Sequence, residues 1–256
     1  MEREYLQLDQ PPGVPPLPLT GERTLPDVPA ENYWYRRHLV VYEWIGERVA
    51  GLRVVDMACG EGYGSDVLAA AGAASVVGVD ANPEAHEHAR LRYTRPNVRF
   101  ERDLVETFAE PCDAVVFLQT IEHVEDAGAI LEHFKSILAP GGVAFVSTPN
   151  VLTLAPPGAE KSDNPWHLHE YRAEEFRALC EAHFPRVELR GVFHARKLRA
   201  HELALKLGWD GVHKRLGLTK RFYDRFTPAI SASDFALRES DLDRALDFIA
   251  VCHAPA

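Results

Sequence analysis

Residues 54–64 read VVDMACGEGYG, and this stretch decides the fold. An apolar run ends at Asp56 and leads into three glycines at alternate positions, Gly60, Gly62 and Gly64. Glycine adopts positive φ without strain and lets the backbone approach a ligand closely. The pattern therefore predicts a strand, a tight loop and the start of a helix, with the loop wrapped around a cofactor.

A second buried strand is predicted for residues 75–79, SVVGV, which end at Asp80. A carboxylate about twenty residues after the glycines is placed to bind both hydroxyls of a ribose. A dinucleotide fingerprint would read G-x-G-x-x-G, with its pyrophosphate on a helix N-terminus, whereas this loop reads D-x-A-x-G-x-G. The sequence therefore favours a nucleoside cofactor other than a dinucleotide.

The D-x-A-x-G-x-G loop resembles that of the class I S-adenosylmethionine-dependent methyltransferases. Three further segments follow in the order that such a domain requires: VRFERDL at 98–104, DAVVFLQTIEHV at 113–124 and LAPGGVAFVSTPN at 138–150. The resemblance implies strands three to five here, with a substrate-facing loop after the fourth. It also implies S-adenosyl-L-methionine as cofactor, with these binding residues: Asp56, Ala58, Gly60, Gly62, Asp80, Ala81, Asp103, Leu104 and Gln119.

Length and composition agree with one catalytic domain. The chain has 256 residues, 46% of them hydrophobic, and strands alternating with helical patterns are typical of a mostly parallel sheet. We expect an α/β fold with a Rossmann-like, seven-stranded class I methyltransferase sheet and helices on both faces. No segment approaches the roughly 18 apolar residues of a membrane span, and Met1–Tyr5 does not begin a signal pattern, so a cytoplasmic enzyme is expected. Four scattered cysteines disfavour a disulfide or zinc framework.

Three parts are predicted along the chain. Residues 1–30 form a Pro-rich N-terminal arm that either wraps the domain or is disordered. Residues 31–195 and 245–256 form the methyltransferase domain. Residues 196–244 form a helical substrate-binding cap between strands six and seven, because a tight hairpin would need only a few residues there.

An aromatic helix is predicted from residue 31. In related methyltransferases such a helix closes over the cofactor, so the resemblance implies that Tyr33 and Arg37 reach the carboxylate of its methionine part. The alternative is an ordinary helix that packs on the sheet.

The cap region is basic. Between Arg186 and Arg225, eleven Lys or Arg stand against four Asp or Glu, although the whole chain carries a net charge of −10. A solvated helix face explains such a run, and so does binding of a carbohydrate, an anionic small molecule or RNA. The acidic remainder disfavours nucleic acid, whose binding depends on broad phosphate neutralisation.

Oxygen is the expected methyl acceptor. The loop after the fourth strand lacks the Asn/Asp-Pro-Pro-Tyr/Phe motif of base amino methyltransferases, and Cys112 lies at the wrong end of that strand to attack a pyrimidine. A hydroxyl needs a base or a metal, and His123 is the leading candidate base because neutral imidazole accepts a proton near neutral pH. His167 and His169, which would share one side of an extended segment, could replace it. For each histidine a structural role is the alternative.

Glu122 and His123 also suggest a metal. Their loop resembles the Glu-x-x-Glu-His loop of ubiquinone-biosynthesis O-methyltransferases, which binds a divalent cation, but Gln119 replaces the first glutamate. A Mg²⁺ site built from Gln119, Glu122 and His123 would be weaker than one with two carboxylates. A bound cation would lower the pKa of the hydroxyl as a Lewis acid.

The expected partner is a small-molecule hydroxyl compound, with a sugar preferred. Residues 21–27, residues 33–38 and the basic insertion resemble actinobacterial methyltransferases of methylmannose polysaccharide biosynthesis, which implies the anomeric hydroxyl of a short mannoside as acceptor. The alternatives are a quinone, polyketide or other aromatic hydroxyl, an RNA, and a protein that binds the cofactor without catalysis.

Overall fold

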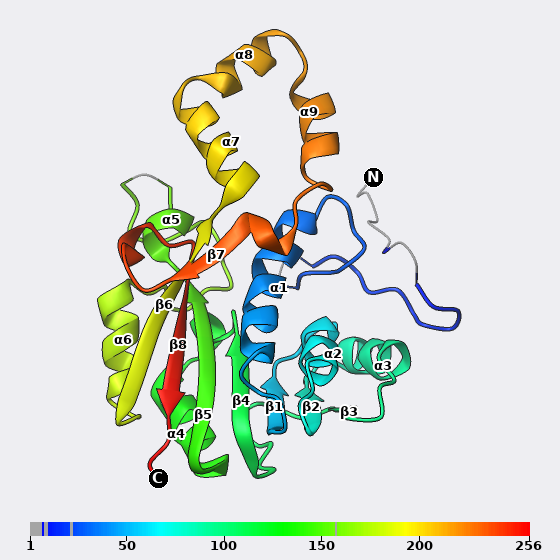
Figure 1. Ribbon diagram of the computed structural model, residues 1–256, viewed down its shortest axis with the longest axis vertical. Coiled ribbons are helices and arrows are strands. Elements are labelled where there is room, and N and C mark those ends of the chain that lie inside the picture. Colours follow the sequence, from blue (N-terminus) through cyan, green and yellow to red (C-terminus); the bar gives the residue numbers. More distant parts are fainter. Residues whose placement is uncertain (1–6, 8–9, 21–22, 157) are drawn as a thin grey trace.

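The computed structural model describes residues 7, 10–20, 23–156 and 158–256. Its centre is an eight-stranded sheet of order β3-β2-β1-β4-β5-β8-β6-β7 (Figure 1). Neighbours from β3 to β5 pair in parallel, whereas β8 runs antiparallel to both β5 and β6. The strands are β1 Arg53–Met57, β2 Ser75–Val79, β3 Val98–Glu101, β4 Cys112–Leu118, β5 Leu138–Pro149, β6 Arg186–His194, β7 Phe235–Arg238 and β8 Asp247–His253.

The expectation of seven strands was wrong by one. The additional strand is β7, which pairs antiparallel with the second half of β6, from Gly191 to His194. It has only four residues and lies inside the region predicted to be a helical cap. So short an edge strand leaves little apolar periodicity to read, which is why the sequence did not indicate it.

Nine α-helices and three short 3₁₀ helices connect the strands within the described residues. The α-helices are α1 Asn32–Gly46, α2 Tyr63–Ala70, α3 Pro83–Arg92, α4 Ala127–Ile137, α5 Val151–Leu154, α6 Ala173–Glu181, α7 Arg196–Lys206, α8 Trp209–Arg215 and α9 Thr219–Phe226; the 3₁₀ helices are η1 Ile121–His123, η2 Ala232–Asp234 and η3 Leu242–Arg244. None of the helices described is long and apolar enough to cross a membrane.

Helices cover both faces of the sheet, because alternate strand residues point to opposite sides. Val55 packs with α4 and α6 through Phe134 and Phe176. Its neighbour Val54 packs with α1 and α2 through Ile45 and Leu68. The two cores lie on opposite faces of the sheet, as in doubly wound α/β proteins.

The helical insertion stands apart from these layers. Helices α7, α8 and α9 form an arch that extends beyond the end of the sheet at which β5 finishes (Figure 1). The chain returns from the arch through η2 and β7 to the sheet edge. We call residues 196–226, which include the three helices, the helical lobe.

The N-terminal arm packs against the domain where it is described. Leu17, Leu25 and Val28 are buried in a small cluster of their own. The Pro15 carbonyl oxygen lies 2.7 Å from Nδ1 of His88 on α3. Of the segments interpreted above, Met1–Tyr5 and residues 21–22 lie outside the described residues.

Candidate active site

A cleft of about 270 Å³ opens at the carboxyl ends of β1, β2 and β4. This edge is where open α/β sheets bind their ligands. The lining comes from five parts of the chain: Arg23 and Thr24 of the arm; His38 and Tyr42 of α1; Ala58, Cys59, Gly60, Glu61 and Tyr63 of the glycine loop and the start of α2; Asp80 directly after β2; and Leu118, Gln119, Thr120 and His123 at the end of β4 and after it.

Two of the three alternating glycines have the positive φ that the sequence predicts, whereas Gly64 does not. Gly60 and Gly62 have φ of 57° and 98°, and Ala58 shares the left-handed region at 56°. A Cβ at Gly62 would lie 2.8 Å from Cβ of Ala89, so α3 also requires glycine there. The loop can therefore lie close both to α3 and to a ligand.

Asp80 faces the cleft and fixes the loop. Its Oδ2 accepts a hydrogen bond from the Gly60 N–H at 2.8 Å, and its Oδ1 accepts one from the Asn82 N–H at 2.9 Å. Asp80 therefore has a structural role in addition to the ribose contact that the resemblance implies.

Besides Asp56, Tyr33 and Arg37, four expected cofactor residues are not among those lining the cleft: Gly62, Ala81, Asp103 and Leu104. The last three belong to turns after β2 and β3, and the Asp103 carboxylate accepts hydrogen bonds from the Leu104 N–H and the Thr107 hydroxyl. Their contact with the cofactor stays a prediction.

Asp56 lies behind the glycine loop and not on the cleft wall. It is completely buried and accepts hydrogen bonds from Ser65 Oγ at 2.6 Å and from the Tyr42 hydroxyl at 3.2 Å. Burial raises the pKa of its carboxyl to about 7, although these two hydrogen bonds oppose the shift. Asp56 thus ties β1 to α1 and α2 beneath the loop.

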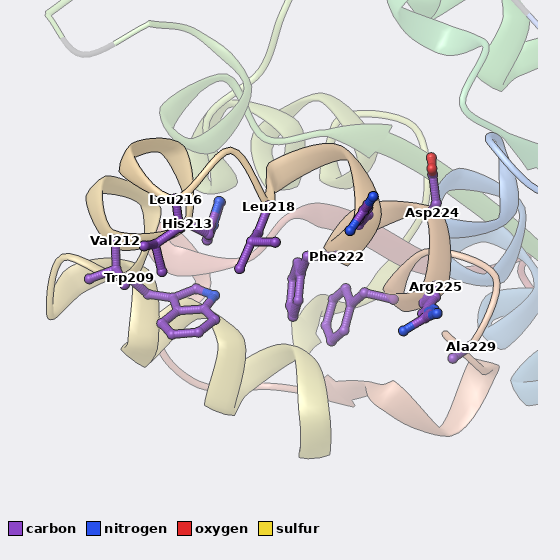
Figure 2. Close-up of a pocket in the computed structure, with 11 residues that line it drawn as sticks. Trp209, Val212, His213, Leu216, Leu218, Phe222, Asp224, Arg225 and Ala229 are labelled. Atoms are coloured by element: carbon purple, nitrogen blue, oxygen red, sulfur yellow. The ribbon is translucent and has the colours of Figure 1, made fainter.

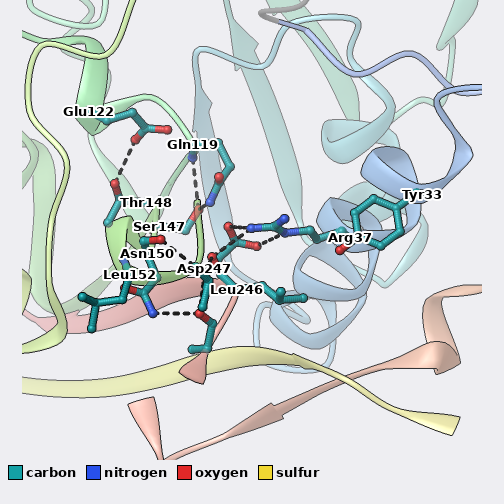
Figure 3. Close-up of polar contacts among 12 residues, drawn as sticks. Tyr33, Arg37, Gln119, Glu122, Ser147, Thr148, Asn150, Leu152, Leu246 and Asp247 are labelled. Atoms are coloured by element: carbon teal, nitrogen blue, oxygen red, sulfur yellow. Dashed lines mark hydrogen bonds and ion pairs between the residues drawn. The ribbon is translucent and has the colours of Figure 1, made fainter. Parts of the chain in front are cut away.

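The structure does not bring Tyr33 and Arg37 to the cleft wall. The buried Arg37 guanidinium donates two hydrogen bonds to Asp247, at 2.5 and 2.6 Å, and a third to the Leu246 carbonyl at 2.8 Å (Figure 3). Tyr33 pairs its hydroxyl with Nε2 of His194 at 2.8 Å. These contacts join α1 to β8 and β6, and binding of the cofactor carboxylate by Tyr33 or Arg37 stays a prediction.

Arg23, Thr24 and His38 line the cleft without having been predicted to do so. Thr24 Oγ1 lies 3.0 Å from the Tyr63 hydroxyl and 3.3 Å from Nδ1 of His38. Burial lowers the pKa of His38 to about 4, so its ring is neutral. In the sequence, Arg23 and Thr24 are adjacent polar residues in a proline-rich arm. The arm has no periodicity that would distinguish it from a linker, so the pair could not be recognised as part of a site.

Glu122, His123 and His167 come together beside the cleft. Each offers a ligand atom, and these atoms lie within 4.8 Å of one another. The His123 and His167 rings are 4.9 Å apart between centroids. The structure therefore joins two residues of η1 to one from the long segment after β5.

Glu122 is a buried carboxyl without a cationic partner among its described hydrogen bonds and ion pairs. Its Oε2 accepts a hydrogen bond from Thr148 Oγ1 at 3.1 Å (Figure 3). Burial raises the pKa of Glu122 to about 8. Gln119, the third expected metal ligand, lines the cleft and donates from Nε2 to Ser147 Oγ at 2.9 Å.

His167 and His169 do not share one side of the segment, contrary to expectation. His167 is buried, with Nδ1 2.7 Å from Glu170 Oε1 and Nε2 2.9 Å from Asn164 Nδ2. His169 is exposed and its ring lies against Tyr171. The backbone turns here because the Glu122 carbonyl accepts hydrogen bonds from both Leu168 and His169 N–H groups.

The sheet order and the glycine loop together define a Rossmann-like protein with a nucleoside cofactor site. A family model described as a methyltransferase domain matches residues 33–203. A relative from Mycolicibacterium smegmatis, named as a probable S-adenosylmethionine-dependent methyltransferase, is 38% identical over 251 residues, covering 93% of this chain and 96% of that protein. The chain belongs to the S-adenosylmethionine-dependent methyltransferases.

More distant matches agree with this family. A ubiquinone biosynthesis O-methyltransferase from Xylella fastidiosa is 36% identical over 130 residues, which cover 46% of this chain and 52% of that protein. A methyltransferase structure from Mesorhizobium loti superposes with a TM-score of 0.54 at 20% identity, covering 83% of this chain and 97% of the other. The latter likeness supports the fold alone.

Proposed function

We propose that the protein transfers the methyl group of S-adenosylmethionine to a hydroxyl of a small carbohydrate. The observation that carries the proposal is the Glu122, His123 and His167 cluster beside the cofactor cleft. A hydroxyl must lose a proton during methyl transfer, and this cluster supplies groups that can assist the loss.

The methyl of a sulfonium is already activated, so the protein has to align the acceptor oxygen and remove its proton. His123 Nδ1 lies 3.0 Å from the Trp166 carbonyl oxygen, to which it can only donate. In the neutral ring Nε2 is then the unprotonated nitrogen, and it acts as the proton acceptor.

A divalent cation is the second way to use the cluster. A buried carboxylate and two imidazoles can ligate one ion once Nε2 of His167 exchanges its contact with Asn164 Nδ2 for the ion. Glu170 at Nδ1 then supports His167 as a carboxylate does behind a metal-binding histidine. Two imidazoles favour Zn²⁺, Fe²⁺ or Ni²⁺ over the Mg²⁺ expected from the sequence, because Mg²⁺ prefers oxygen ligands. A bound cation would lower the pKa of the acceptor hydroxyl.

Arg23 replaces Arg37 as the proposed partner of the cofactor carboxylate. It lines the cleft, whereas the guanidinium of Arg37 is held by Asp247. An arginine can bind a carboxylate through two parallel hydrogen bonds.

An aromatic hydroxyl is the second candidate acceptor. It is favoured by the similarity to a ubiquinone biosynthesis O-methyltransferase over 130 residues. The loop at Glu122 and His123 also resembles the Glu-x-x-Glu-His loop of such enzymes. The carbohydrate proposal depends on the likeness of the insertion and of the first helix to methyltransferases of methylmannose polysaccharide biosynthesis.

Methyl transfer from labelled S-adenosylmethionine to short mannosides and to catechols, with and without chelator, tests these proposals. We expect product on a mannoside. Product on a catechol alone would replace the carbohydrate by the aromatic acceptor, and loss of turnover with chelator would establish the metal role.

Two histidine variants test the cluster. His123→Ala is expected to lower turnover about 10²- to 10⁴-fold and leave cofactor affinity unchanged. His167→Ala should also lower turnover, whereas the matched variant His169→Ala should not. Equal turnover in all three would remove the cluster from the mechanism.

A further inference from the structure

The helical lobe contains a groove that shares no lining residue with the cofactor cleft. Its volume is about 790 Å³, and it runs between α8 and α9. Ligand pockets in proteins typically measure about 300 to 1,000 Å³ and are mostly apolar, with a few polar groups that orient the ligand. The groove has a volume in this range, and its lining is mostly apolar with a few charged side chains.

One end of the groove is apolar. Trp209, Val212 and Leu216 of α8 and its C-cap face Leu218 and Phe222 across it (Figure 2). Leu216 is 63% exposed and Val212 47%. A contiguous exposed patch of large apolar side chains often marks a binding surface.

The floor of the groove is an aromatic stack. The ring of Phe222 stacks on those of His213 and Phe226, with centroids 5.7 and 5.2 Å apart and interplanar angles of 17° in both cases. Phe222 also stacks on His201 of α7. This packing gives the groove a preformed apolar surface.

The other end of the groove is charged. Arg225 and Asp224 lie there (Figure 2), and Arg221 stands one helical turn earlier on α9. Asp224 is paired with Lys220 at 2.6 Å. Within the described part of the chain, neither Arg221 nor Arg225 forms an ion pair.

The positive charge of the whole helical lobe also lies mainly on arginines. Lys and Arg outnumber Asp and Glu nine to three between residues 196 and 226. Each of the three acidic residues is paired with a lysine: Glu202 with Lys206, Asp210 with Lys214 and Asp224 with Lys220. Most of the positive charge that is left lies on arginines, two of which line the groove.

The geometry points to a binding site for a single anionic amphiphile, with its alkyl chain between α8 and α9 and its carboxylate or phosphate at Arg221 and Arg225. Charge complementarity selects an anion for the arginine end, and the apolar end excludes a fully polar ligand. The site is separate from the cleft that holds the glycine loop, with which it shares no lining residue.

Calorimetric titration of the whole protein with octanoate, dodecanoate and dodecyltrimethylammonium, all below micelle formation, tests the site. We expect dodecanoate to bind more tightly than octanoate and at least tenfold more tightly than the cation. Quenching of Trp209 fluorescence on binding should disappear in Trp209→Phe. Equal affinity for dodecanoate and the cation would overturn the proposal.

Matched variants locate the site. The double change Arg221→Gln and Arg225→Gln should weaken dodecanoate binding tenfold or more, and Arg215→Gln, outside the groove, should not. Leu216→Asn should weaken it, whereas Leu207→Asn should not, since Leu207 is 80% exposed and does not line the groove. If Leu216→Asn disturbs the fold, as judged by circular dichroism, Val212→Thr takes its place.

Two other results would reassign the groove and overturn the proposal. If sedimentation shows a dimer that dissociates on Leu216→Asn, the groove is the interface with a second copy of the chain. If the protein binds vesicles of anionic phospholipid but not dodecanoate, the groove is a membrane-binding surface.

Discussion

Glu61 Oε1 lies 2.8 Å from Nε2 of His88, and both side chains are completely buried. Glu61 belongs to the glycine loop and His88 to α3, while Nδ1 of the same imidazole contacts the Pro15 carbonyl of the arm. The other Glu61 oxygen accepts a hydrogen bond from the Tyr93 hydroxyl at 2.7 Å. One carboxylate therefore connects the cofactor loop, a helix and the arm.

Glu61→Ala is expected to destabilise the protein by about 3 to 5 kcal/mol, because it leaves buried polar partners without their acceptor. Cofactor affinity should fall as well, since the arm and the loop both line the cleft. Urea unfolding and calorimetry measure the two effects. The control is Glu87→Ala, whose exposed pair with Arg90 should contribute less than about 1 kcal/mol; equal losses in the two variants would contradict the structural role of Glu61.

Glu122 makes stability depend on pH. Its pKa is about 8 in the folded protein against 4.5 for a glutamate in solvent. Between these values the folded state holds a proton that the unfolded state has lost, so stability falls as pH rises through this window. Glu122→Gln, which resembles the protonated acid, should therefore be more stable than the wild type near pH 8, with the difference vanishing near pH 4.5.

Urea unfolding across this range measures the difference. The control Glu106→Gln changes an exposed residue and should show no such trend. A difference for Glu122→Gln that is constant with pH would refute the raised pKa.

Asp80→Ala should weaken S-adenosylmethionine binding by about 1.5 to 3 kcal/mol, the contribution expected of a charged hydrogen bond. Asp80→Asn keeps an oxygen for the Gly60 N–H but loses the acceptor of the Asn82 N–H, so it retains the contact that supports the loop while removing the charge expected to bind the ribose. We expect the Asn variant to melt only slightly below the wild type and to bind the cofactor less tightly. Wild-type affinity in that variant would refute the ribose contact.

Substitution of Arg37 should affect stability, whereas substitution of Arg23 should affect cofactor binding. Arg37→Gln breaks a buried ion pair with Asp247 and is expected to cost about 3 to 5 kcal/mol of stability. Arg23→Gln should leave the melting temperature unchanged and raise the Kd for S-adenosylmethionine. The reverse outcome would restore Arg37 as the ligand of the cofactor carboxylate.

The fold could be predicted from the sequence where strands are buried on both faces. Val54 and Val55 pack into different cores, so both must be apolar, and a continuous apolar run followed by glycines is typical of a central strand that enters a ligand-binding loop. The four-residue β7 and the path of the arm depend on contacts distant in sequence. Neither leaves a local pattern.

The residues of the candidate site could be named from the sequence more reliably than their arrangement in space. Glu122, His123 and His167 were recognised as reactive residue types, but an extended segment was expected to place His167 and His169 together. The two hydrogen bonds at the Glu122 carbonyl turn the backbone and separate them. Arg37 was assigned to the cofactor from the resemblance, and its contact with Asp247, 210 positions away in sequence, leaves no local pattern that could have indicated otherwise.

Those two hydrogen bonds at the Glu122 carbonyl also link the loop after β4 to the long segment that follows β5. If that segment lifts to admit an acceptor, His167 departs and the carbonyl of Glu122 loses both donors at once. The reactive cluster would then exist only in the closed state. Methyl transfer would then require the closed segment, and an acceptor too small to stabilise that closed state would not be methylated.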